Sequence, residues 1–75
     1  MRYVIDSFAW LEYFMGTESG RKVKTILESE TDEKFTPSIC LAEIYAKVAK
    51  VEDQQKAELR RAFMKSRSAL VALTE

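Results

Sequence analysis

Short apolar runs, each followed by polar residues and then a helical pattern, recur along this chain. The first run, residues 3–5 (Y-V-I), is apolar and too short for a helix, so it predicts a buried strand. Asp6 and Ser7 follow it, and both residue types accept hydrogen bonds from the free N–H groups at a helix start. The pattern therefore predicts a strand that passes directly into an apolar helix over residues 8–14, which Gly16 ends.

A second unit repeats this order further along the chain. Apolar residues 23, 26 and 27 have the i, i+3, i+4 spacing of an amphipathic helix. The polar segment 29–34 then leads to Phe35-Thr36, which we predict to be the core of a second strand. Pro37-Ser38 stops this strand and starts a helix, because proline is tolerated in the first helical turn and serine is a favoured cap.

Two more helices and a final strand are predicted for the rest of the chain. Residues 41, 44, 45 and 48 form the core-facing stripe of a third helix. Residues 51–53 contain neither Gly nor Pro, so they fit either a turn capped by Asp53 or the middle of one long helix; we favour the turn. A fourth helix, with an apolar stripe at 59, 62 and 63, ends near 66–68. The apolar run 69–73 then predicts a third strand.

The predicted order of elements is β-α-α-β-α-α-β. Helical connections between short apolar strands indicate a parallel sheet with right-handed crossovers. Because the last strand is apolar on both faces, we expect helices on both of its sides. The sequence thus predicts one α/β domain over residues 1–75, with three layers (α/β/α) around a short parallel sheet.

Composition narrows the class of protein and the chemistry open to it. The chain is 47% apolar and 32% charged, values typical of a soluble globular domain. Its apolar runs are shorter than the roughly 20 residues that span a bilayer, and acids interrupt its N-terminus where a signal peptide would not have them. We therefore expect a cytoplasmic protein without a membrane segment. The chain has one cysteine and no histidine, so hydrolysis would depend on carboxylates with Mg²⁺ or Mn²⁺.

Asp6 and Glu43 are the candidate catalytic and metal-binding residues. Both fall in the first turns of strand-to-helix units, and the carboxyl ends of parallel strands share one edge of a sheet. Two carboxylates there would hold a hydrated cation that activates a water for attack on a phosphodiester. Each residue also has a structural interpretation, since Asp6 would cap the first helix and Glu43 would pair with Lys47 on an exposed helical face.

The other candidate residues are better explained by a structural role. Glu12 is expected on the surface of the first helix, and Cys40 is expected to be a small buried residue. The basic face of the fourth helix is usually a solvated face, although it would also suit a nucleic-acid backbone. The aromatic residues at helical spacing are expected in the core or an interface before a base-stacking platform; they are Trp10, Tyr13, Phe14 and Tyr45.

Two stretches resemble a known family. The first stretch is Y-V-I-D-S at 3–7 with A-W-L-E-Y-F at 9–14, and the second is T-P-S-I-C-L-A-E-I-Y at 36–45. They resemble PIN domains of the VapC type, the toxins of prokaryotic toxin–antitoxin pairs. This resemblance implies that Asp6 and Glu43 are metal-site carboxylates and that Ser7 supports the same site. It further implies an endoribonuclease dependent on Mg²⁺ or Mn²⁺, with RNA as its substrate and a cognate antitoxin as its partner.

The chain departs from the family pattern in length. Family members continue past this point, and their later part supplies further essential acids. We therefore interpret the chain as a truncated PIN-like fold, the N-terminal half, with an incomplete site that is inactive alone. The first strand would then be an exposed edge, which predicts a homodimer or higher oligomer. The alternative is a non-catalytic fragment that dimerises or binds an antitoxin, and a third possibility is an unrelated small α/β domain.

Overall fold

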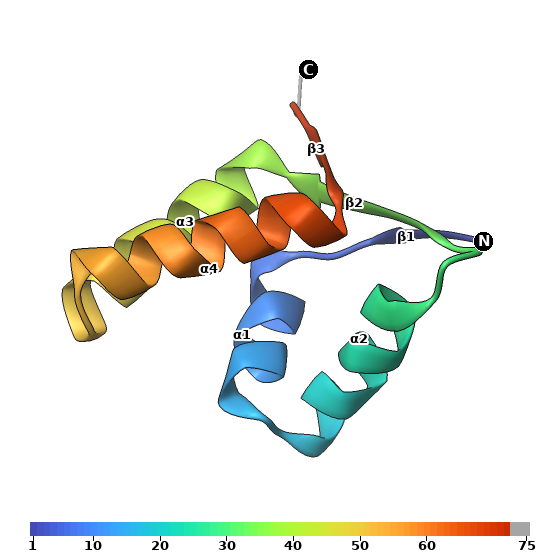
Figure 1. Ribbon diagram of the computed structural model, residues 1–75, viewed down its shortest axis with the longest axis horizontal. Coiled ribbons are helices and arrows are strands. Elements are labelled where there is room, and N and C mark those ends of the chain that lie inside the picture. Colours follow the sequence, from blue (N-terminus) through green and yellow to red (C-terminus); the bar gives the residue numbers. More distant parts are fainter. Residues whose placement is uncertain (73–75) are drawn as a thin grey trace.

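Three short strands form a parallel sheet in the order β1-β2-β3. The computed structural model describes residues 1–72, so Leu73 of the predicted third strand lies outside the described residues. The element order and the parallel sheet are confirmed, as is the α/β class (Figure 1). The elements are β1 (Arg2–Val4), α1 (Ser7–Met15), α2 (Glu18–Glu28), β2 (Glu33–Pro37), α3 (Ser38–Val51), α4 (Gln54–Arg67) and β3 (Ala69–Val71).

Side-chain caps fix where three of the helices begin. Asp6 accepts a hydrogen bond from the Ala9 N–H at the start of α1, and Thr17 caps α2 in the same way. Asp53 accepts from the Lys56 N–H at 2.7 Å, so residues 52–53 are a turn and α3 and α4 are separate helices, as predicted. Gly16 ends α1 in the left-handed region, with φ at 71°.

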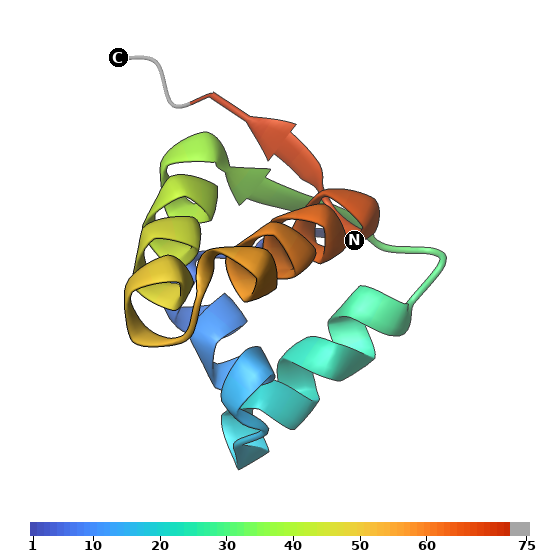
Figure 2. The same cartoon turned by 60° about the vertical axis from the view of Figure 1, so that its left-hand side comes forward.

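One buried cluster joins all four helices to the sheet. Ile5, which follows β1, packs with side chains from each helix; those residues are Trp10, Leu27, Ile44, Val48, Ala57 and Met64. A sheet lying between two helical layers would divide such a cluster. The pairs α1–α2 and α3–α4 therefore lie on one side of the sheet. Figure 2 shows β2 and β3 side by side, with α3 and α4 next to them. Two crossovers of the same hand that step in the same direction across a sheet give this arrangement.

The other face of the sheet is open in residues 1–72. The register places Val4, Phe35 and Ala69 beside one another on this face, and Val4 is 68% exposed. Leu70 in β3 pairs with Thr36 and so belongs to the opposite, helix-covered face, where it is 38% exposed. The helices expected on both sides of the third strand are thus found on one side only in the described part of the chain. A strand apolar on both faces indicates that both faces suit burial, but it does not indicate which segment covers each one.

No helix of the described residues combines the length and apolar character needed to cross a membrane.

Candidate metal centre

Asp6 lies directly after β1 and is exposed. Its Oδ1 accepts the Ala9 N–H at 2.8 Å, so the helix-cap interpretation is observed. Within residues 1–72 the hydrogen bonds of this side chain engage only Oδ1, which leaves Oδ2 without a hydrogen-bond partner among these residues. A carboxylate has two oxygen acceptors, so one can accept the cap hydrogen bond while the other binds a cation. Capping and cation binding are therefore compatible at Asp6.

Glu43 lies in the second turn of α3 and is exposed. The helical ion pairs found in residues 1–72 do not include a pair between Glu43 and Lys47. The structural interpretation of Glu43 as half of an exposed ion pair is therefore not supported. Its carboxylate has no hydrogen-bond partner within the described residues.

The fold brings the two helices that carry these carboxylates together. Asp6 and Glu43 follow the carboxyl ends of neighbouring parallel strands, β1 and β2, and α1 packs against α3. Oxygen donors of this kind suit Mg²⁺ and Mn²⁺. Yet no group of three or more acidic, His or Cys side chains with metal-binding geometry is found in residues 1–72. The donor chemistry fits a hard cation, and two carboxylates supply only part of its coordination shell.

Ser7 and Glu12 have different surroundings. Ser7 is the first residue of α1, beside Asp6, and is partly buried. Glu12 was expected on the surface, but its side chain is partly buried and accepts a hydrogen bond from the Thr17 hydroxyl. Thr17 in turn caps α2. Glu12 therefore stabilises the turn between α1 and α2 through its hydrogen bond with Thr17.

A buried hydrogen-bond chain ties α1 to the end of β2. The indole Nε1–H of Trp10 donates to Thr36 Oγ1 at 3.0 Å, and both side chains are fully buried. The Ser68 hydroxyl donates to the Met64 carbonyl, so the 2.6 Å contact between Thr36 and Ser68 has the Thr36 hydroxyl as its donor. Trp10 was expected in the core or an interface, and its full burial confirms the core. The sequence pattern did not predict this bond. A buried tryptophan needs an acceptor for its N–H.

The aromatic residues of α1 and α4 pack together. Tyr13 stacks on Phe63 with ring centroids 5.7 Å apart, and Phe14 lies 6.2 Å from the same ring. The Arg60 guanidinium lies 4.7 Å from the centroid of Phe14, and Arg67 lies 5.2 Å from that of Phe63. These two arginines of the basic face therefore cover aromatic rings as well as facing solvent.

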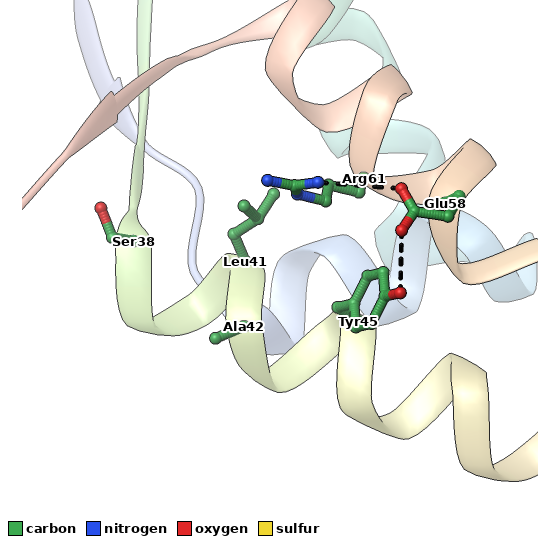
Figure 3. Close-up of a pocket in the computed structure, with 6 residues that line it drawn as sticks. All are labelled: Ser38, Leu41, Ala42, Tyr45, Glu58 and Arg61. Carbon is green, nitrogen blue, oxygen red and sulfur yellow. Dashed lines mark hydrogen bonds and ion pairs between the residues drawn. The ribbon is translucent and has the colours of Figure 1, made fainter. Parts of the chain in front are cut away.

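A separate hollow of about 410 Å³ lies between α3 and α4 (Figure 3). The Tyr45 hydroxyl donates to Glu58 at 2.9 Å, and Arg61 pairs with the same carboxylate at 3.7 Å. Because Glu58 accepts a hydrogen bond from the protonated phenol, the pKa of Tyr45 is raised above its usual value. Neither Asp6 nor Glu43 lines this hollow, whose residues are Ser38, Leu41, Ala42, Tyr45, Glu58 and Arg61.

Comparison with known proteins decides the family. The family model of the PIN domain matches residues 3–75. The chain belongs to the PIN domain family. No curated protein matches it.

A solved structure shares the fold of this PIN domain. The chain is similar to a chain in the crystal structure of VapBC2 from Rickettsia felis bound to a DNA fragment from their promoter, with a TM-score of 0.71 and 16% identity. The match covers 99% of this PIN domain and 56% of that chain, so this sequence spans little more than half of its neighbour's length. At this identity the likeness concerns the fold.

Cys40 is buried in this PIN domain, as expected from the sequence. It is 8% exposed and free, and histidine, the usual activating base, is absent from the chain.

Proposed function

We propose that this PIN domain is part of a metal-dependent endoribonuclease of the VapC toxin type, in which Asp6 and Glu43 hold Mg²⁺ or Mn²⁺. The observation that carries the proposal is the pair of exposed carboxylates that follow neighbouring parallel strands on two contacting helices. Membership of the PIN family and the fold shared with a chain of VapBC2 support it.

Each residue has a defined role in this proposal. Asp6 keeps Oδ1 on the Ala9 N–H and offers Oδ2 to the cation, while Glu43 offers a carboxylate that no protein group in residues 1–72 engages. Ser7 supports the site through its hydroxyl beside Asp6. The cation, when bound, would activate a water and offset the negative charge of the RNA phosphodiester.

Two carboxylates leave the coordination shell incomplete. Mg²⁺ keeps several waters and binds weakly to so few protein ligands unless further acids or substrate phosphates take part. We therefore propose that residues 1–75 alone are inactive and that additional carboxylates, outside this sequence or on a second molecule, complete the site. The proposed partners are RNA, a cognate antitoxin and a second copy of the chain, in the cytoplasm.

A non-catalytic role is the second candidate. The hollow between α3 and α4 combines apolar Leu41 with the polar network around Glu58, as a site for a protein segment would. The exposed Val4 on β1 is in turn suited to contact with another chain. On this view residues 1–75 dimerise or bind an antitoxin without cleaving RNA.

Mn²⁺ binding separates the two candidates. We would titrate the protein with Mn²⁺ and follow the relaxation of water protons for the wild type, Asp6→Asn, Glu43→Gln and the control Glu28→Gln. Glu28 is an exposed helical glutamate that pairs with Lys24. Loss of binding in the two site variants but not in the control is expected. Equal binding by all four proteins would contradict the metal-site proposal.

RNA cleavage in the presence of Mn²⁺, with light scattering to record the oligomeric state, tests the activity itself. We expect no cleavage by the isolated chain. Cleavage that disappears in Asp6→Asn would instead show that association of copies completes a working site.

A further inference from the structure

We infer that Thr36 is a positioning residue for the Asp6–Glu43 pair, acting through its hydrogen bond with Trp10. The inference rests on the proposed metal site, and it states that a buried hydroxyl helps to place the two carboxylates. The contact that supports it joins the first turn of α1 to the last residues of β2.

On one side, Trp10 and Asp6 belong to the same helical turn. The Trp10 backbone N–H donates to the Asp6 carbonyl at 3.1 Å, so the two residues move as one rigid unit. A shift of the buried indole that moves the Trp10 backbone would therefore displace the Asp6 carboxylate as well.

On the other side, Thr36 is held at the end of β2, immediately before α3. Pro37 follows it with a fixed φ, and Ser38 begins the helix that carries Glu43. The Ser38 hydroxyl also donates to the Val71 carbonyl at 3.2 Å, which anchors the start of α3 to β3.

Within residues 1–72, the Trp10–Thr36 bond is the one side-chain hydrogen bond that joins α1 to β2 or α3. The buried cluster that Trp10 shares with Ile44 and Val48 is apolar, and the hydrophobic effect is itself non-directional. The bond between Nε1–H and Oγ1 adds a directional contact that fixes the orientation of α1 about its own axis relative to β2. It thereby sets where Asp6 lies relative to Glu43.

Removal of the hydroxyl has a predictable effect on geometry. In Thr36→Val the side-chain shape is nearly kept, but the Trp10 N–H is left in the core without an acceptor. A buried unpaired donor is costly, so the indole would move toward another acceptor or water and carry the first turn of α1 with it. Thr36→Ser keeps the acceptor and should keep the geometry.

The test compares Mn²⁺ affinity among folded variants, measured by water-proton relaxation at a temperature at which circular dichroism shows every variant to be folded. Thr36→Val should bind Mn²⁺ roughly tenfold more weakly, as is typical when a group that orients a metal ligand is lost. Trp10→Phe, which removes the donor instead, should show the same loss. Thr36→Ser should retain the wild-type affinity.

A matched core variant excludes a purely structural effect. Leu27→Val trims a buried side chain at the far end of α2 and should leave Mn²⁺ affinity unchanged. If Thr36→Val and Leu27→Val lower affinity equally, or neither does, the positioning role is refuted. If wild-type binding does not depend on Asp6 and Glu43, the proposed metal site fails and the positioning role fails with it. Wild-type binding that depends on both carboxylates but not on Thr36 refutes the positioning role alone.

Discussion

Replacement of Gly20 by alanine should destabilise the fold, although alanine is the better helix former. Gly20 lies in α2, and a Cβ atom there would be 2.1 Å from the Glu12 carbonyl oxygen, 2.6 Å from the Glu12 carbonyl carbon and 2.9 Å from the Tyr13 Cα atom. All three are backbone atoms of α1, so no side chain can rotate aside. The helices themselves would have to separate.

The magnitude follows from two opposing contributions. Alanine in a helix interior gains about 1 kcal/mol over glycine. Overpacking against a rigid neighbour costs about 3 kcal/mol, the upper part of the usual range, because the whole α1–α2 contact must open. The net loss of about 2 kcal/mol corresponds to a melting temperature lower by about 8–16 °C for a domain of this size.

Urea unfolding followed by tryptophan fluorescence measures this effect. Trp10 is the single tryptophan and is fully buried, so its emission reports the loss of the core. Ser19→Ala is the matched control, since Ser19 precedes Gly20 on the same helix and is exposed. The control should be neutral or slightly stabilising. A Gly20→Ala protein as stable as Ser19→Ala would refute the close packing of α1 on α2.

Two further predictions concern carboxylates. Asp6→Ala should lower the free energy of unfolding by about 1 kcal/mol, whereas Asp6→Asn should leave it nearly unchanged, because asparagine caps a helix as well as aspartate does. Thermal unfolding of both variants measures this difference. Equal losses of stability in the two variants would argue against the cap. Hydrogen bonds from Ser29 and from the N-terminal ammonium, which lies 3.2 Å from Asp32 Oδ1, hold the pKa of Asp32 below its ordinary value of 3.8. A pKa lowered in the folded state contributes stability above the unfolded pKa that is lost as the pH falls through the folded value. Asp32→Asn should therefore lose less melting temperature than the wild type between pH 7 and pH 3, and an identical loss in both proteins would contradict the assignment.

The helices and strands could be predicted from the sequence because their determinants are local. Asp6 and Asp53 cap the helices that follow them, and Gly16 ends α1, each through groups only a few residues away. The strand at 69–71 was evident from its apolar run. The order of elements and the parallel sheet predicted that Asp6 and Glu43 share one edge of the sheet, whereas the adjacency of their strands came from the structure. Their role as metal ligands stays a prediction.

The tertiary structure alone decided the remaining features, because they depend on residues far apart in the chain. The Trp10–Thr36 bond joins residues 26 positions apart, and Gly20 meets the backbone of the preceding helix. Hydrophobic periodicity shows which face of an element is buried but not which partner buries it. For that reason the sequence pattern predicted helices on both sides of the sheet, whereas all four helices share one buried cluster and leave the face of Val4 and Phe35 open in residues 1–72.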